Sequence, residues 1–265
     1  MLSRYDSIYL SPHLDDVVLS CAGQINQQIR SGRSMLIVTI AAGDPPRSGL
    51  SDFAKSLHQR WESTSDTVAT RRSEDKRACE RLGADFLHWH FLDCIYRQDP
   101  HSGQSLYASE EAIFGTLHPV DSTLVDQMAY LVSELPDWEH ILVPLGAGNH
   151  VDHQLTRLAA EQFLGSNYPI YYEEYPYVQN VDILKLLSPP DLDWQSRIIP
   201  LSKNDLNAKI EAITCYQSQL STFFNDQDDL VKQVAGYLVD IGGERLWHIA
   251  NQNDSLLSST QEQLL

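Results

Sequence analysis

The chain has 265 residues, of which 42% are hydrophobic and 21% are charged. These values are ordinary for a folded protein and predict one α/β domain spanning residues 1–265. Basic residues number 19 and acidic residues 36, so the formal net charge is −17. An acidic surface repels phosphate backbones and anionic lipid. Neither nucleic acid nor a membrane is therefore an expected partner.

The cysteines and the N-terminus indicate the cellular compartment in which the protein is expected. Four scattered cysteines without a CxxC pair are typical of reduced, buried thiols. No basic stretch followed by an apolar core opens the chain, and no apolar run approaches the roughly 18 residues that span a bilayer. We expect a cytoplasmic protein, and the sequence leaves open whether it forms a homo-oligomer.

Apolar strand-like runs alternate with helical stretches through the first two thirds of the chain. Strands are expected at residues 7–11, 35–40, 86–92, 141–145 and 170–174, and helices at 17–30, 67–82, within 106–135, and at 151–163. Residues 41–66, rich in glycine and proline at their start, are expected to form a loop. The alternation predicts right-handed βαβ crossovers and a Rossmann-like, mostly parallel sheet flanked by helices.

Beyond Pro176 the alternation weakens, which suggests a smaller C-terminal extension. A helix is expected at residues 203–220. The polar tail from about residue 250 to 265 is expected to be disordered.

Polar residues gather where the first predicted strand passes into the first helix, as Ser11-Pro12-His13-Leu14-Asp15-Asp16. Ligands of open α/β sheets bind at the carboxyl ends of strands. Because neighbouring residues point in different directions, one of the two aspartates can bind a metal while the other faces the reacting atom. The alternative is that either aspartate only caps the helix.

A second polar segment, Gly146–His153, follows the predicted strand at 141–145. His150 and His153 are three residues apart at a helix start, so their side chains share a face. Surface histidines beside a capping aspartate are the alternative. If the strands are parallel, both segments lie at one edge of the sheet. Two histidines and a carboxylate that leave a fourth position open are the usual arrangement of a hydrolytic zinc site.

The motifs Pro12-His13-Leu14-Asp15-Asp16 and His150-Val151-Asp152-His153 resemble the PIG-L/LmbE-like zinc-dependent N-acetylglucosamine de-N-acetylases. The markers of that family are a PHxDD motif near the N-terminus and an HxDH motif near the middle. A weaker element, Arg71 followed by Glu74 and then Leu82-Gly83, also matches. The resemblance extends over roughly residues 5–175.

The resemblance implies a role for each motif residue. His13, Asp16 and His153 would hold Zn²⁺, and Asp15 would act as general base. His150 would stabilise the oxyanion and protonate the leaving amine, and Asp152 would orient a histidine. The chemistry is consistent with this set, because amide hydrolysis needs an activated nucleophile, charge stabilisation at the carbonyl oxygen and a proton for the amine.

The same resemblance would place Arg71 and Asp93 at the sugar, with Arg97 as a further candidate. One feature departs from the family, where some sugar deacetylases carry a tyrosine shortly before HxDH. Here that stretch is Gly146–Asn149, without a tyrosine. Either His150 and zinc do that work, or a tyrosine from residues 171–177 reaches into the site.

The predicted function is zinc-dependent removal of an acetyl or acyl group from an N-acetylated amino sugar, such as an N-acetylglucosamine-containing conjugate. One alternative is a zinc amidase acting on a non-sugar acyl amine or a thiol conjugate. Another is a non-catalytic Rossmann-like binding module. The binding module is disfavoured because residues 12–16 stand at the turn where a GxGxxG fingerprint would be expected, and their carboxylates would repel a pyrophosphate.

Overall fold

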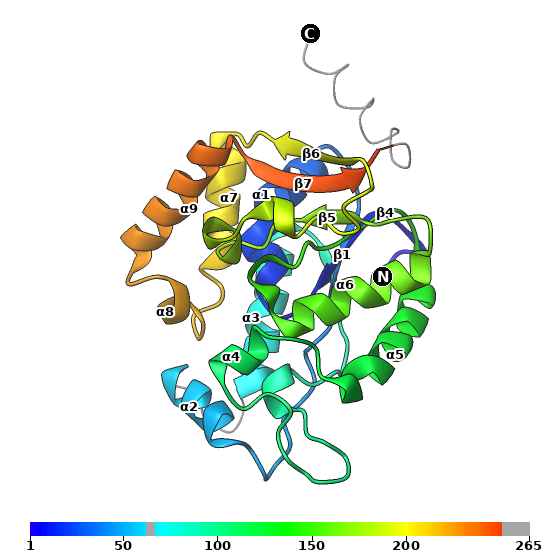
Figure 1. Cartoon of the computed structure of the whole chain (residues 1–265). Coiled ribbons are helices and arrows are strands. Elements are labelled where there is room, and N and C mark those ends of the chain that lie inside the picture. Colours follow the sequence, from blue (N-terminus) through cyan, green and yellow to red (C-terminus); the bar gives the residue numbers. More distant parts are fainter. Residues whose placement is uncertain (62–66, 251–265) are drawn as a thin grey trace.

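The computed structural model describes residues 1–61 and 67–250 of the chain. A twisted sheet in the order β3-β2-β1-β4-β5-β7-β6 runs through its centre (Figure 1). Its strands are β1 (Arg4–Ser11), β2 (Met35–Thr39), β3 (Asp85–His88), β4 (Asp137–Pro144), β5 (Ile170–Tyr172), β6 (Trp194–Ile199) and β7 (Glu244–Ile249).

Strands β1 to β5 are parallel. The chain builds outward from β1 to β2 and β3, then returns to the other side of β1 to form β4 and β5. The connections after β1 and β4 therefore run in opposite directions along the sheet. Open α/β sheets bind ligands at the carboxyl ends of the strands where this reversal occurs. The predicted Rossmann-like, mostly parallel sheet is confirmed.

Helices cover both faces of the sheet. They are α1 (Asp16–Arg30), α2 (Asp52–Arg60), α3 (Thr67–Leu82), α4 (Glu110–Ile113), α5 (Ser122–Ser133), α6 (Val151–Leu164), α7 (Lys203–Ile213), α8 (Leu220–Phe223) and α9 (Gln227–Ile241). Figure 1 shows α5 and α6 together on one side, and α1, α3 and α7 on the other. No helix in the described ranges is long and apolar enough to cross a membrane.

Alternating side chains of the central strands pack into two separate hydrophobic cores, one on each face of the sheet. In β1, Tyr9 packs in the core with α1, α3, α7 and α9, whereas Ile8 and Leu10 pack in the core with α5 and α6. In β2, Ile37 and Val38 divide between the cores in the same way. A strand covered on both faces needs an unbroken apolar sequence, which explains the continuous run at residues 35–40.

A third apolar cluster lies near the β1–α1 junction and joins Leu14 to α2, α4 and the 3₁₀ turn Cys94–Tyr96. The expectation of a loop at residues 41–66 is wrong for its middle, which forms α2. The Ser51 side chain accepts a hydrogen bond from the backbone N–H of Ala54 and so caps this helix. That serine was the available sequence signal. Residues 62–66 lie outside the described ranges.

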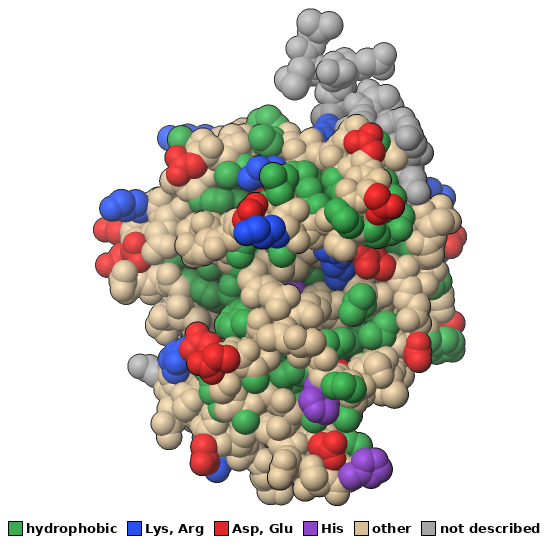
Figure 2. Space-filling view, viewed as in Figure 1, with side chains coloured by type: hydrophobic (Ala, Val, Ile, Leu, Met, Phe, Trp, Pro, Cys, Tyr) green, Lys and Arg blue, Asp and Glu red, His purple; other side chains and the backbone are tan. Residues whose placement is uncertain are grey.

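The C-terminal extension adds β7 and β6 antiparallel to the far edge of the sheet. Neither strand nor α9 was foreseen from the sequence. The helix expected at 203–220 is wrong in extent, because α7 ends at Ile213 and a short α8 begins at Leu220. The proposed disordered tail lies outside the described residues from 251 onward. Acidic and basic side chains are interspersed on the face shown in Figure 2.

Candidate metal-dependent active site

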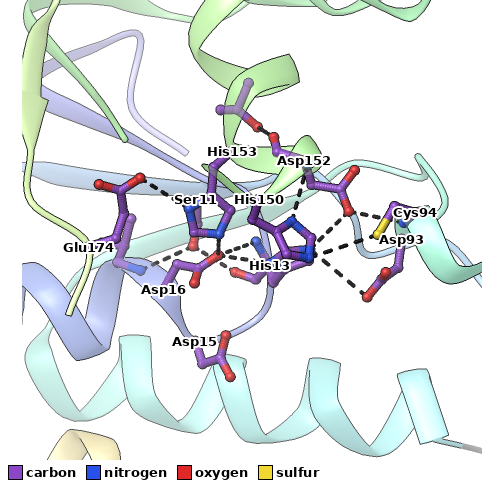
Figure 3. A network of polar contacts seen from close by, with 12 residues as sticks. Ser11, His13, Asp15, Asp16, Asp93, Cys94, His150, Asp152, His153 and Glu174 are labelled. Carbon is purple, nitrogen blue, oxygen red and sulfur yellow. Dashed lines mark hydrogen bonds and ion pairs between the residues drawn. The ribbon is translucent and has the colours of Figure 1, made fainter. Parts of the chain in front are cut away.

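Both polar motifs meet at the carboxyl edge of β1 and β4 (Figure 3). The first motif joins β1 to α1, and the second joins β4 to α6. Strands β1 and β4 are hydrogen-bonded neighbours, so residues about 140 positions apart in sequence become contacts. The ring centroids of His13 and His153 lie 5.5 Å apart.

His13 lies between two carboxylates. Its Nδ1 is 3.1 Å from Asp16 Oδ2, and its Nε2 is 3.0 Å from Asp152 Oδ2. Asp152 is itself held by an ion pair with Arg97 and by the backbone N–H of Cys94 at 3.0 Å. Burial lowers the pKa of His13, but Asp16 and Asp152 outweigh it and raise this pKa well above its usual value. Asp152 thus orients a histidine, and that histidine is His13.

His153 is fully buried, and its two ring nitrogens have different surroundings. Nδ1 is 3.1 Å from Glu174 Oε1. Nε2 lies 3.3 Å from Asp16 Oδ2, yet it has no hydrogen-bond partner among the described residues. A buried nitrogen without a partner is costly unless something else binds its lone pair. Nε2 of His153 is therefore available to a metal ion.

Two spacings among these donors match those expected around a tetrahedral metal. Zinc ligands at about 2.0–2.1 Å from the ion lie about 3.3 Å from one another. Asp16 Oδ2 is 3.1 Å from His13 Nδ1 and 3.3 Å from His153 Nε2. Burial raises the pKa of Asp16, but His153 and His13 outweigh it, so this pKa is held well below its usual range. Two imidazoles and one ionised carboxylate are a donor set that suits a divalent metal.

His150 has a different hydrogen-bonding role. Its Nδ1 accepts the backbone N–H of Asp152 at 3.2 Å and caps α6, which assigns the proton of the neutral ring to Nε2. Burial lowers the pKa of His150 well below its usual value. Ring nitrogens of His13, His150 and His153 lie within 4.8 Å of one another. As a neutral N–H donor, His150 is suited to a hydrogen bond toward substrate.

Asp15 points away from Asp16, toward α3 (Figure 3). It occupies the N-cap position of α1 without a side-chain capping hydrogen bond, so capping does not account for its carboxylate. Its Oδ2 is 3.6 Å from the Arg71 guanidinium. Burial raises the pKa of Asp15 to about 6, although Arg71 opposes the rise. A carboxylate with a pKa near the working pH suits general-base catalysis.

The three predicted substrate residues have unequal positions. Arg71 lies over the Trp61 ring at 5.3 Å, beside Asp15. Asp93 Oδ1 accepts the backbone N–H of Ile95, and its Oδ2 lies 4.0 Å from His13 Nε2. Both residues border the metal-ligand cluster.

Arg97 is placed behind that cluster. Its guanidinium is buried and ion-paired with Asp152 and Asp121. These contacts hold Asp152 against His13 through Nη1 of Arg97, whereas its Nη2 has no hydrogen-bond partner among the described residues. A substrate contact of Arg97 stays a prediction. The sequence could not show its ion pairs, because Asp121 and Asp152 are distant from it in the chain.

Two further residues lie near the site: Glu174, which was not singled out from the sequence, and Tyr177, one of the candidate tyrosines at residues 171–177. Tyr177 packs edge-on against His153 at 5.6 Å and contacts Phe114 at 5.9 Å. By contrast, the hydroxyls of Tyr171 and Tyr172 bond elsewhere, to Glu161 and to the Leu10 carbonyl. Glu174 follows β5, the next strand along the same sheet edge. Its position after a strand was the available signal.

The fold is a Rossmann-like α/β fold, and the cluster at its sheet edge is a candidate metal site. Comparison with known proteins identifies the family. Residues 8–164, more than half of the chain, match the PIG-L model, described as GlcNAc-PI de-N-acetylase. The chain therefore belongs to the PIG-L family of de-N-acetylases, hydrolases that remove an acyl group from an amide nitrogen.

Individual relatives are deacetylases of similar size. The chain is 30% identical over 187 residues to 2'-N-acetylparomamine deacetylase of Niallia circulans, covering 65% of this chain and 67% of that one. It is similar in structure to the zinc-inhibited form of the teicoplanin deacetylase Orf2, with TM-score 0.76, 25% identity and coverage of 94% and 99%. The A40926 pseudoaglycone deacetylase Dbv21 gives TM-score 0.71 at 25% identity, with coverage of 94% and 98%.

Proposed function

We propose that the protein is a zinc-dependent deacetylase of an N-acetylated amino-sugar conjugate. One observation carries the proposal: Asp16 Oδ2 bridges His13 Nδ1 and His153 Nε2 at ligand spacing, with the Asp15 carboxylate next to them in the chain. The named relatives support the substrate class, since they are deacetylases named for 2'-N-acetylparomamine, teicoplanin and the A40926 pseudoaglycone.

His13, Asp16 and His153 are the proposed ligands. His150 is left out of the ligand set because its Nδ1 is engaged by the backbone of α6 and its Nε2 carries the proton. Zinc bound there would supply a water with a pKa near 7 and polarise the acyl carbonyl.

Side chains of this protein then complete the reaction. Asp15 accepts the proton of the attacking water, while His150 Nε2–H donates a hydrogen bond to the carbonyl oxygen as negative charge develops there. Since the His150 ring is neutral and its pKa is lowered, it is a poor source of a full proton. Asp15, once protonated, is the better donor to the leaving amine. This assignment replaces the proton donation that the family resemblance implied for His150.

Substrate contacts are proposed for Arg71 and Asp93, whose charged groups can bond sugar hydroxyls beside the site. Tyr177 is proposed to occupy the place left by the absent tyrosine before HxDH. Its phenol has no hydrogen bond to any described residue, and Asp15, Asp16 and Arg71 all influence its pKa. Its hydroxyl is thus near the reacting groups and available to substrate.

The test is a substrate panel with metal analysis. Purified protein should carry one zinc per chain and release free amine from an N-acetylglucosamine conjugate, but far more slowly from N-acetyl amino acids. Protein treated with a chelator should lose the activity and regain it with zinc. Faster release from the amino acids would favour the non-sugar amidase, and a protein that binds no metal would contradict the proposed site.

A further inference from the structure

Glu174 lies directly behind the proposed metal site and is fully buried. Its Oε1 is 3.1 Å from His153 Nδ1 and accepts the backbone N–H of Gly146 at 2.7 Å. Its Oε2 accepts the backbone N–H of Ala147 at 3.2 Å. Both backbone partners are donors, and an N–H on His153 Nδ1 would be the third. Figure 3 shows the contact between Glu174 and His153.

We propose that Glu174 is a positioning residue that holds His153 with its proton on Nδ1 and its Nε2 lone pair directed at the metal. A carboxylate accepts a hydrogen bond and cannot donate one, so the neutral ring must place its proton on Nδ1. A histidine ligand whose other nitrogen bonds a carboxylate is fixed in orientation and is a more basic ligand. This inference rests on the zinc site proposed above.

The same carboxylate also fixes the turn that carries the second motif. Gly146 (φ 98°), Gly148 (φ 78°) and Asn149 (φ 62°) all have positive φ, which is unfavourable for residues other than glycine. Glu174 bonds the first two amides of this turn. It therefore couples the strained turn after β4 to the ring of His153, and β5 supports both.

Glu173 provides a matched control in the adjacent position. It is also buried, but it faces the C-terminal extension, accepting from Trp247 Nε1 at 2.7 Å and from the Tyr237 hydroxyl at 3.2 Å. A Glu173→Gln change alters a buried carboxylate of the same segment without touching His153 or the turn.

The experiment measures zinc affinity of the full chain by competition with a chelator, in wild type, Glu174→Gln and Glu173→Gln. Glutamine at 174 must turn an NH₂ toward one of the three donors. We expect zinc affinity to fall about 10–100-fold in Glu174→Gln. In Glu173→Gln it should change less than about twofold, because Glu173 contacts neither the metal nor its ligands.

A second readout reports the hydrogen bond itself. In zinc-loaded protein with ¹⁵N-labelled histidine, wild type and Glu173→Gln should show a downfield, slowly exchanging Nδ1–H resonance that Glu174→Gln loses. If Glu174→Gln does not fold, Glu174→Asp is measured in its place, since it keeps the charge but is one methylene too short to reach all three donors.

Wild-type zinc affinity in Glu174→Gln with an unchanged Nδ1–H resonance would overturn the role of Glu174 alone. Equal losses in Glu174→Gln and Glu173→Gln would overturn it too, as general destabilisation. A wild-type protein that binds no zinc would overturn the proposed function as well, so the two failures are distinguishable.

Discussion

Asp15 and Asp16 are neighbours in the chain, yet their carboxylates have different surroundings. Asp16 lies between His13 and His153, and Asp15 lies beside the buried guanidinium of Arg71. Their pKa values are displaced in opposite directions, upward for Asp15 and downward for Asp16. Divergent pKa values in a pair of acids mark different chemical roles.

Replacing Asp15 by asparagine should remove most turnover and leave zinc content unchanged. The amide is nearly isosteric with the carboxylate but cannot accept the proton, and general-base contributions are about 10²–10⁴-fold. Turnover and zinc content are measured on the same preparation. Asp16→Asn is the contrasting variant and should lose zinc. Full turnover in zinc-loaded Asp15→Asn would rule out Asp15 as the base.

The pH dependence of kcat/KM should show an acid limb from Asp15. Only the ionised carboxylate accepts a proton, so the rate falls as pH drops through its pKa, about 6 in the metal-free protein. A bound cation favours the carboxylate, which places the limb at or below that value. The profile is measured on the zinc-loaded enzyme over roughly pH 4.5–8. An acid limb centred well above 6 would contradict the assignment.

Arg71→Ala and Asp93→Ala should weaken sugar recognition without loss of zinc. A charged group bonded to a hydroxyl contributes about 1.5–3 kcal/mol, so kcat/KM on an N-acetylglucosamine conjugate should fall by roughly one to two orders of magnitude. A simple acyl amine without a ring gives the comparison for substrate. Equal rates of all three proteins on the sugar conjugate would remove both residues from the sugar site. Arg71 also contacts Asp15, so an equal loss on both substrates would instead assign it to supporting the base.

At the scale of elements, the turn between β4 and α6 depends on glycine. Gly148 has a positive φ, which strains any residue with a side chain. A methyl group added there would also lie 3.0 Å from Tyr177 Cβ. At Gly32, φ is 89° and nothing lies within 4 Å of the added carbon. The two positions separate backbone strain from steric contact.

Gly148→Ala should therefore destabilise the protein more than Gly32→Ala, for which strain alone costs about 1–2 kcal/mol. It should also lower turnover, because Tyr177 must shift from its place beside His153. Gly32→Ala should keep wild-type turnover. Thermal unfolding midpoints and rates of both variants are compared. Equal unfolding midpoints and equal rates would show that Tyr177 is not constrained by Gly148.

At the scale of the whole molecule, a buried ion pair ties the C-terminal extension to α1. Lys209 Nζ on α7 is 2.7 Å from Glu244 Oε1 on β7, and it also donates to the Ser20 carbonyl at 3.0 Å. Glu244 in turn accepts the backbone N–H groups of Gly23 and Gln24 in α1. The ion pair and its hydrogen bonds thus connect α1, α7 and β7.

Lys209→Met should cost about 3–5 kcal/mol of unfolding free energy, because it leaves the Glu244 charge buried without its partner. The Lys209→Met, Glu244→Gln double variant should recover part of that loss. Arg81→Met is the control, since the Arg81–Glu211 pair is about half exposed and its loss should cost about 0–1 kcal/mol. Denaturant unfolding gives the values. A cost for Lys209→Met as small as that of Arg81→Met would show that the pair does not anchor the extension.

Much of the fold was predictable because its signals are local. Continuous apolar runs predicted β1, β2 and β4, and helix ends such as Leu82-Gly83 were marked by glycine. The extension was missed because β6 is an edge strand without a buried residue and β7 pairs antiparallel with residues far away in the chain. The α2 helix was missed because glycine and proline nearby outweighed the capping signal of Ser51.

By itself, the sequence determined the family and the sheet edge at which the site lies, since PHLDD and HVDH each follow a strand that can be recognised locally. Tertiary structure decided the rest of the site. The burial that raises the pKa of Asp15, the engagement of Arg97 with Asp121 and Asp152, and the contact of Glu174 with His153 all join groups from separate elements. Such contacts depend on how strands and helices pack, and no local pattern of residues specifies them.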